Sequence, residues 1–215
     1  MVIVHEVFQG IQGEGTLAGF PFTFIRLAGC NLRCDYCDTP EARVPEGTEE
    51  SVIELADRVA GMGLSRVMVT GGEPLLQKDG RVLIDALVER GLDVTVETNG
   101  SIELEGVNPR ARIIMDVKTP GSGQETATNI MNLMWLKPTD EVKFVLASRQ
   151  DYAWARDFCR ARGLFETGRT IHFSPAHRVL PAAELAEWIL ADRLNARVHL
   201  QLHKVLWPEG EPKMK

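Results

Sequence analysis

Hydrophobic residues along this chain alternate between short apolar runs and longer stretches with helical spacing. Runs of strand length cover residues 2–8, 22–28, 66–70, 93–98, 113–118, 141–146, 170–174 and 198–202. Amphipathic helices are predicted over residues 51–61, 78–90, 151–162 and 181–194, where apolar residues recur every three or four positions. Strands that alternate with helices predict an α/β fold with a parallel sheet and right-handed crossovers.

The repeat is interrupted over residues 99–111. Gly100, Gly106 and Pro109 leave too little chain there for a full crossover helix. Residues 126–136, which include a Met-Asn-Leu-Met run, fit a short helix or an ordered loop equally well. We therefore predict an incomplete or distorted (β/α) barrel.

Ligands in folds of this kind bind at the carboxyl ends of the strands. Several polar or reactive residues fall at predicted strand ends, namely Cys30, Thr70, Glu97, Lys118 and Ser174. One mouth of the barrel should therefore collect them.

Composition narrows the class of protein. With 215 residues, 44% of them hydrophobic, the chain can bury the core of a single domain spanning 1–215. Residues 1–21 would supply an N-terminal strand and a loop, and the Pro/Gly/Glu/Lys-rich residues 208–215 a mobile tail.

Charge and hydropathy exclude some partners. A net charge of −6 without a basic block argues against tight, sequence-independent binding of nucleic acid and favours a small-molecule substrate. Without an apolar window of about 18 residues, a membrane span is not expected. The N-terminus lacks a basic, apolar-cored leader, so we expect a cytoplasmic location.

Three cysteines, Cys30, Cys34 and Cys37, lie within eight residues directly after the strand at 22–28. Cys159, the remaining cysteine, falls inside a predicted helix far along the chain, so it is not expected to be a fourth ligand. Three thiolates would leave one iron of a four-iron cluster open to a small molecule.

Zinc and disulfides are alternatives for these thiols. Compact zinc sites usually combine two pairs of ligands, and the sequence offers no second Cys or His pair. Clustered cysteines in a chain without a secretory leader indicate a reducing compartment rather than a disulfide framework. An iron–sulfur cluster is therefore the favoured interpretation.

Two glycine-rich segments carry further signals. Gly71-Gly72-Glu73-Pro74 follows a short apolar strand, where glycines let backbone groups approach a ligand closely, although such a turn is often only a strand-to-helix connection. The segment at residues 9–15 precedes no helix and lacks the Lys-Ser/Thr pair of a phosphate loop. Its Glu14 is better suited to binding a substrate.

The Cys-x3-Cys-x2-Cys spacing, with Tyr36 before the last thiol, and the Gly-Gly-Glu-Pro turn together resemble the radical S-adenosylmethionine superfamily. The resemblance implies a [4Fe-4S] cluster whose open iron chelates S-adenosyl-L-methionine, and a 5′-deoxyadenosyl radical that abstracts hydrogen from the substrate. It also implies cofactor contacts from Gly72, Glu73, Asp116, Val117, Lys118, Ser174, Pro175, Ala176 and His177.

Further motifs run in order from residue 9 to residue 204: Gln-Gly-Glu-Gly, Arg26, Cys37-Asp38-Thr39, Glu97-Thr98-Asn99-Gly100 and Gln201-Leu202-His203-Lys204. Together they resemble the 7-carboxy-7-deazaguanine synthase family. This resemblance implies a lyase that converts 6-carboxy-5,6,7,8-tetrahydropterin to 7-carboxy-7-deazaguanine with loss of ammonia, an early step toward queuosine. It also implies a homodimer, Mg²⁺, and an external electron donor of the flavodoxin or ferredoxin type.

The family match assigns substrate contacts to Ile11, Gln12, Gly13, Glu14, Arg26, Thr70 and His203. Arg26 would pair the substrate carboxylate, which suits a planar guanidinium with parallel donors. Glu14 would accept hydrogen bonds from the pterin N–H groups. An Arg26 paired with an internal carboxylate, a solvated Glu14 and a His203 at the rim remain the alternatives.

The resemblance also assigns Mg²⁺ to the hydroxyl of Thr39, although the adjacent Asp38 is a chemically more usual ligand. The chain departs from the family pattern at its end. Some members stop shortly after the His-Lys pair and contact substrate through the terminal carboxylate. Here the chain runs on, so we expect Glu209 or a backbone carbonyl to replace that contact.

Two other functions remain as alternatives. A radical enzyme that installs a glycyl radical on a partner protein shares the cysteine loop, but it leaves Gln-Gly-Glu-Gly and His203-Lys204 unexplained. A non-catalytic iron–sulfur or zinc module accounts for the thiols, but not for the Gly-Gly-Glu-Pro turn or Arg26.

Overall fold

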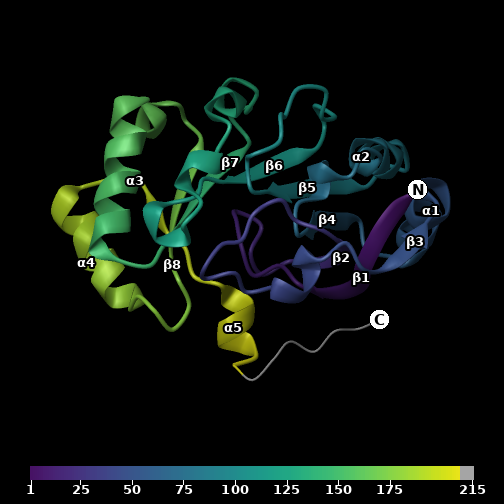
Figure 1. Ribbon diagram of the computed structural model, residues 1–215, viewed down its shortest axis with the longest axis horizontal. Coiled ribbons are helices and arrows are strands. Elements are labelled where there is room, and N and C mark those ends of the chain that lie inside the picture. The colour runs from purple at the N-terminus through teal and green to yellow at the C-terminus, as the bar shows by residue number, and fades with distance from the viewer. Residues whose placement is uncertain (209–215) are drawn as a thin grey trace.

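The computed structural model describes residues 1–208, whose strands form one nine-stranded sheet in the order β3-β1-β2-β4-β5-β6-β7-β8-β9 (Figure 1). The strands are β1 (Val2–Ile11), β2 (Pro21–Leu27), β3 (Thr48–Glu50), β4 (Arg66–Gly71), β5 (Asp93–Thr98), β6 (Arg112–Asp116), β7 (Glu141–Leu146), β8 (Thr170–Pro175) and β9 (Arg197–Val198). β1 pairs antiparallel with β2 and β3, and all pairings from β2 to β9 are parallel. The sheet curves from β3 to β9 without closing, which confirms the prediction of an incomplete barrel.

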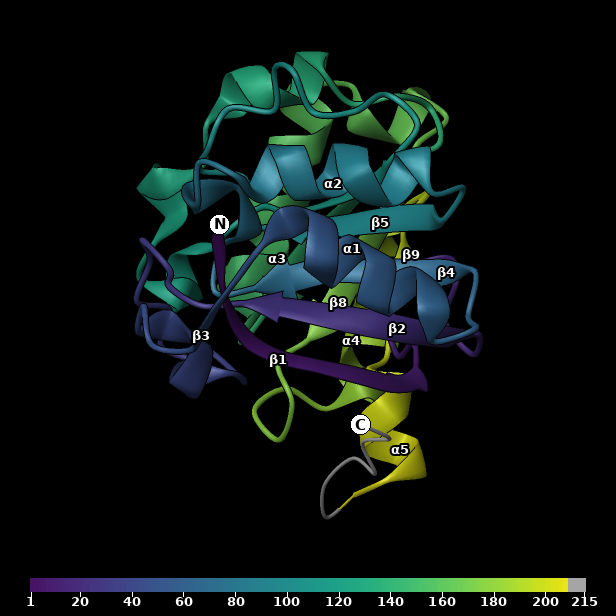
Figure 2. The same ribbon diagram turned by 90° about the vertical axis from the view of Figure 1, so that its right-hand side faces the viewer.

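Four helices cover the convex face of this sheet (Figures 1 and 2). They are α1 (Val52–Gly61), α2 (Gly80–Glu89), α3 (Arg149–Ala161) and α4 (Ala182–Asp192), each within a few residues of a predicted helix. The short α5 (Leu202–Leu206) lies apart from them, on the other side of the sheet.

The period-2 alternation of the strands decides which side chains face these helices. In β7, Val142 and Phe144 belong to the apolar core between the sheet and the helices (the helix-side core). Lys143 lies between them in the strand, so its side chain points to the opposite face of the sheet. On that opposite face a small apolar cluster of Phe22, Met68 and Ile114 closes one end of the sheet. The other end, toward the carboxyl ends of the strands, carries polar side chains.

The structure differs from the predicted elements in two strands. The strand predicted at 198–202 is present only at its first residue. β9 ends at Val198, the His199 N–H still donates to the Phe173 carbonyl at 2.9 Å, and the Leu202 N–H then donates to the Gly13 carbonyl at 2.9 Å. The short β3 was not predicted, because its Thr-Glu-Glu sequence has no apolar pattern and it is held by backbone pairing to β1.

The two ambiguous regions are also resolved. The connection from β5 to β6 contains no α-helix, as predicted. Residues 126–136 form short 3₁₀ helices, Glu125–Ala127 and Ile130–Met134, held by the buried Asn132. Asn132 accepts from Leu104 N and donates to two backbone carbonyls, which explains how a polar side chain orders an otherwise exposed apolar loop.

Within residues 1–208, no helix is long and apolar enough to cross a membrane. The predicted tail begins at Pro208, which is exposed. Residues 209–215, including Glu209, lie outside the described part of the chain.

Candidate functional site

A cavity of about 800 Å³ opens at the carboxyl ends of the strands. Most of the predicted site residues line it, although they come from distant parts of the sequence: Ile11, Gln12, Gly13, Glu14, Arg26, Cys30, Cys34, Cys37, Thr39, Thr70, Gly72, Asp116, Lys118, Ser174, Pro175, Ala176, His177 and His203. The prediction that one mouth collects Cys30, Thr70, Glu97, Lys118 and Ser174 is confirmed, because all five line this cavity.

Two predicted cofactor residues do not line the cavity. Val117 is fully buried in the helix-side core, because the strand pleat turns its side chain away from its neighbours Asp116 and Lys118. Glu73 is fully buried, and its carboxylate accepts hydrogen bonds from Leu75 N, Thr98 Oγ1 and Asn99 N at 2.7–3.0 Å. Glu73 therefore joins the Gly-Gly-Glu-Pro turn to the segment after β5.

The glycines of that turn line the cavity and also permit a close backbone contact. A Cβ on Gly72 would lie 2.3 Å from the Gly29 carbonyl oxygen and 2.6 Å from that of Ala42. A Cβ on Gly71 would lie 2.1 Å from the Leu27 oxygen. Only glycine thus permits the turn to pack against the loop that carries the thiols.

The three thiols lie on the loop after β2, next to donors that suit a cluster. Cys30 Sγ accepts from Leu32 N at 3.4 Å and from Asn99 Nδ2 at 3.7 Å. Arg43 donates to the Cys34 carbonyl at 2.7 Å, and its pKa is raised chiefly by a hydrogen bond to the Cys37 side chain. Three cysteine thiolates on one loop are the donor set of an iron–sulfur cluster, so the chemistry of these residues fits one.

Cys159 lies elsewhere. It is fully buried in α3, packs in the helix-side core, and does not line the cavity. Burial raises the pKa of its thiol, as expected for an inert core cysteine.

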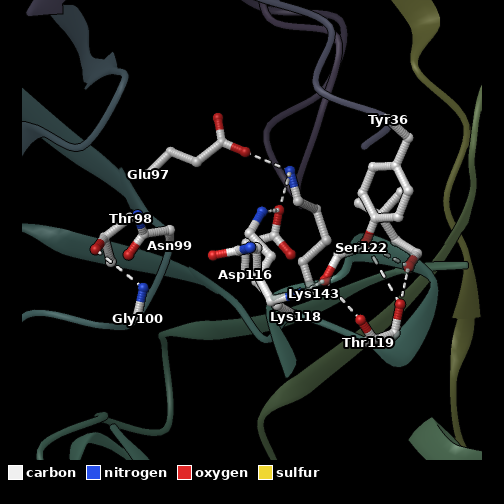
Figure 3. A network of polar contacts seen from close by, with 12 residues as sticks. Tyr36, Glu97, Thr98, Asn99, Gly100, Asp116, Lys118, Thr119, Ser122 and Lys143 are labelled. Carbon is white, nitrogen blue, oxygen red and sulfur yellow. Dashed lines mark hydrogen bonds and ion pairs between the residues drawn. The ribbon is translucent and has the colours of Figure 1, made fainter. Parts of the chain in front are cut away.

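Tyr36, between the second and third thiols, ties the loop to the sheet (Figure 3). Its hydroxyl donates to the Val145 carbonyl at 3.1 Å and lies 3.3 Å from Thr119 Oγ1, which donates to the same carbonyl. Burial raises the pKa of Tyr36 to about 12, so it remains a neutral donor.

Two buried polar residues, Glu141 and His199, hold the glycine-rich loop after β1 in place. Thr16 donates through its N–H and its hydroxyl to the carboxylate of Glu141, at 2.9 and 2.5 Å. The Gly15 N–H donates to His199 Nε2 at 2.7 Å. Neutral His199 therefore carries its proton on Nδ1, which faces Ser174 Oγ at 3.4 Å. This contact joins residues more than 180 positions apart, so no local pattern in the sequence predicts it.

The segment around α5 packs against the same glycine-rich loop at the rim of the cavity. A Cβ on Gly13 would lie 1.9 Å from His203 Nδ1, so Gly13 is required for this approach. Gln201 Nε2 bridges Glu14 Oε1 at 2.7 Å and Asp38 Oδ2 at 3.0 Å, and Lys204 pairs with Asp38 at 3.0 Å. The Gln-Leu-His-Lys motif therefore links the loop at Glu14 to the cysteine loop.

Arg26 in β2 lines the cavity and its Nε donates to Glu6 Oε1 at 2.9 Å, with both side chains 17% exposed. This ion pair with an internal carboxylate is the alternative to the predicted contact between Arg26 and the substrate carboxylate. Thr39 lies at the rim, where its hydroxyl donates to Asp38 Oδ1 at 3.3 Å. The two candidate magnesium ligands are thus in contact with each other.

The main group that sequence reasoning missed is Lys143, whose side chain enters the cavity from β7. Its Nζ donates to Glu14 Oε2 at 2.6 Å and forms a short ion pair with Glu97. Burial opposes ionisation of Glu14, but Lys143 lowers the pKa of that carboxyl well below its usual range. A charged residue between two core positions of a strand was the signal that could have identified it.

Comparisons with known proteins identify relatives of this chain. Residues 24–121 match the family model of the radical SAM superfamily. The 7-carboxy-7-deazaguanine synthase of Chlorobaculum tepidum is 41% identical over 95% of this chain and 93% of its own length. That of Methanospirillum hungatei is 42% identical over 94% of this chain and 84% of its own.

A solved structure gives the same result for the fold. The crystal structure of QueE from Escherichia coli superposes with a TM-score of 0.74 over 94% of both chains, at 25% sequence identity. Since the relatives cover nearly the whole chain at this level of identity, the chain belongs to the 7-carboxy-7-deazaguanine synthase family of radical SAM enzymes.

Proposed function

We propose that this protein converts 6-carboxy-5,6,7,8-tetrahydropterin to 7-carboxy-7-deazaguanine with loss of ammonia, on the route to queuosine. The observation that carries the proposal is that a single cavity is lined by the three-thiol loop, by Arg26 and by Glu14. A thiolate set for the radical chemistry and groups suited to a carboxylate and to pterin N–H donors therefore face the same space.

Cys30, Cys34 and Cys37 would hold a [4Fe-4S] cluster, with the cavity lined by Gly72, Asp116, Lys118, and Ser174 to His177 available to S-adenosyl-L-methionine. When bound, the cluster and this cofactor supply the one-electron chemistry that starts hydrogen abstraction. The chain's own contribution is to orient both reactants and to limit water. Its Lys118 ammonium pairs with Asp116 at 3.0 Å, which supports a fixed polar wall beside the thiols.

Substrate binding would use charge at both ends of the pterin. Glu14 is held ionised beside Lys143, so it offers acceptor lone pairs to the ring N–H groups. Arg26 would turn from Glu6 toward the substrate carboxylate, or hold both carboxylates at once through its several donors. Ile11, Gln12 and Gly13 would contribute backbone groups, and Thr70 and His203 would complete the ring contacts.

Mg²⁺ would bind at the rim, where Thr39 and Asp38 provide oxygen atoms in mutual contact. The substrate carboxylate and water would supply its remaining ligands. Asp38 is paired with Lys204, so metal binding there competes with that ion pair.

The remaining assignments of the proposal concern assembly and setting. We propose a single domain that acts as a cytoplasmic homodimer and receives electrons from a flavodoxin- or ferredoxin-type donor. Their support is the family membership and, for a cytoplasmic location, the absence of a membrane-spanning helix within residues 1–208.

The test is an anaerobic assay of the iron–sulfur-reconstituted protein with S-adenosyl-L-methionine, Mg²⁺, dithionite and 6-carboxytetrahydropterin, with products read by mass. Formation of 7-carboxy-7-deazaguanine is the expected result. If only 5′-deoxyadenosine and methionine form, the substrate assignment is wrong. If an intact cluster supports no cleavage at all, the enzyme assignment is wrong as well.

A further inference from the structure

Lys143 lies at the floor of the cavity, in the middle of β7, and is 5% exposed (Figure 3). Its neighbours in the strand, Val142 and Phe144, face the helix-side core, so the lysine stem has no route to solvent except through the cavity. An ammonium buried in this way requires several charged or polar partners to offset its lost hydration.

Three carboxylates from three different elements supply those partners. Lys143 Nζ lies 2.6 Å from Glu14 Oε2, forms a short ion pair with Glu97 Oε1, and lies 3.7 Å from Asp116 Oδ2. An ammonium has three N–H donors and no acceptor. Its donors are therefore directed at carboxylates, so it orients Glu14 and Glu97 rather than binding the substrate itself.

The charges of this cluster do not cancel. Three carboxylates, Glu14, Glu97 and Asp116, face two ammonium groups, Lys143 and Lys118, which leaves an excess of one negative charge. Burial raises the pKa of Glu97 despite the attraction of Lys143, whereas the pKa of Glu14 is lowered. Of the two carboxylates, Glu97 is thus the one closer to taking up a proton.

Other titratable groups around the cluster do not replace Lys143. His199, from the segment after β9, acts on Glu14 electrostatically, but burial lowers its own pKa to about 4, so it is neutral near pH 7. At the rim, Lys204 is already paired with Asp38. Without Lys143, Glu14 and Glu97 would lose the cation they share.

We propose that Lys143 is a positioning residue for the pterin, which keeps Glu14 and Glu97 ionised and fixed as hydrogen-bond acceptors. This inference rests on the proposed function, because it takes the pterin N–H groups as the ligands of these carboxylates. If Lys143 is removed, one carboxylate becomes protonated near neutral pH and changes from an acceptor to a donor. The pterin then meets a donor where its own N–H needs an acceptor.

The variants Lys143→Gln and Lys143→Arg test this role in the reconstituted holoenzyme. We expect Lys143→Gln to raise the KM for carboxypterin about 10- to 100-fold. The apparent pKa of the acid limb in the pH profile of its kcat/KM should rise by about one to two pH units. Lys143→Arg, which retains the charge, should recover part of both losses.

The matched control is Lys78→Gln, because Lys78 is exposed and does not line the cavity. It should leave KM and the pH profile unchanged. If Lys143→Gln does not fold, the double variant Lys143→Gln/Glu97→Gln removes one charge of each sign and should fold. In this double variant Glu14 should still accept a hydrogen bond from the pterin, whereas the carboxylate at position 97 is lost. Carboxypterin should therefore bind the double variant at least tenfold more weakly than it binds wild type, but still measurably.

A second measurement separates this inference from the proposed function. Isotope-edited infrared spectroscopy of glutamate-labelled protein reports carboxylate protonation without any substrate. A protonated glutamate at pH 7 in Lys143→Gln, absent from wild type, supports the inference even if carboxypterin is not turned over. Unchanged infrared titration, or an unchanged KM and pH profile in an enzyme that turns over carboxypterin, would overturn it.

Discussion

Replacing Gly72 by alanine should push the thiol-bearing loop away from the Gly-Gly-Glu-Pro turn. The new Cβ would lie 2.3 Å from the Gly29 oxygen and 2.6 Å from the Ala42 oxygen. Both are backbone atoms, which cannot rotate away, whereas ordinary Cβ contacts begin at 3.4 Å. The loops would have to separate by about 1 Å, a large shift for packed backbone.

The energetic cost follows from the bonds that join these loops. Glu73 N donates to Gly29 O at 2.9 Å, and Gly29 N donates to Ala42 O at 2.8 Å. Overpacking, together with a weakening of these bonds, should lower the free energy of unfolding by about 2–4 kcal/mol. For a chain of this length that corresponds to a Tm about 5–15 °C lower.

The assay is thermal melting of the apoprotein, followed by iron and sulfide analysis after anaerobic reconstitution. Gly72→Ala should melt lower and retain less iron per chain, because the thiols move with the loop. Gly61→Ala is the matched control. A Cβ on Gly61, the last residue of α1, meets nothing within 4 Å, so this variant should be neutral or more stable by up to about 1 kcal/mol. If the two variants have the same Tm and the same iron content per chain, the backbone contact at Gly72 does not constrain the loop.

Three further outcomes are expected. Arg26→Ala should lower kcat/KM for carboxypterin about 10- to 100-fold while uncoupled S-adenosylmethionine cleavage persists, and equal loss of both activities would contradict its assignment to the substrate. Cys159→Ala should retain the full iron content, because Cys159 is a core thiol remote from the cavity, and loss of the cluster would refute the three-ligand site. Urea denaturation should show stability falling by up to about 3 kcal/mol as the pH drops from 6.5 to 4, because burial lowers the pKa of His199 to about 4 and the unfolded chain then binds the extra proton. His199→Gln should lack this slope, and an identical slope in the variant would assign the titration to another group.

The sequence determined the parts of this protein that depend on neighbouring residues. The spacing of Cys30, Cys34 and Cys37 places three thiols on one loop in any fold, because so few residues separate them. Periodicity identified the four helices on the convex face and most strands, because an element that buries one face repeats its apolar residues at the period of that element. The order of the motifs was enough to indicate the family.

Side-chain direction at strand ends was decided by the tertiary structure. Glu73 and Val117 belong to motifs that line the cavity, yet the pleat and a buried hydrogen-bond network direct both side chains away from it. The predicted strand after Val198 failed for a similar reason. Its apolar residues suggested a strand, but a backbone bond from Leu202 to Gly13 draws the chain over the mouth.

The electrostatics of the site also arise only in the folded chain. Lys143 meets Glu97 across 46 residues and Glu14 across 129, and the Gly15 N–H meets His199 across 184. Each residue by itself is an ordinary lysine, glutamate or histidine in an amphipathic sequence. Burial and proximity, which shift their pKa values and fix their directions, exist only once the sheet has curved and brought the carboxyl ends of its strands together.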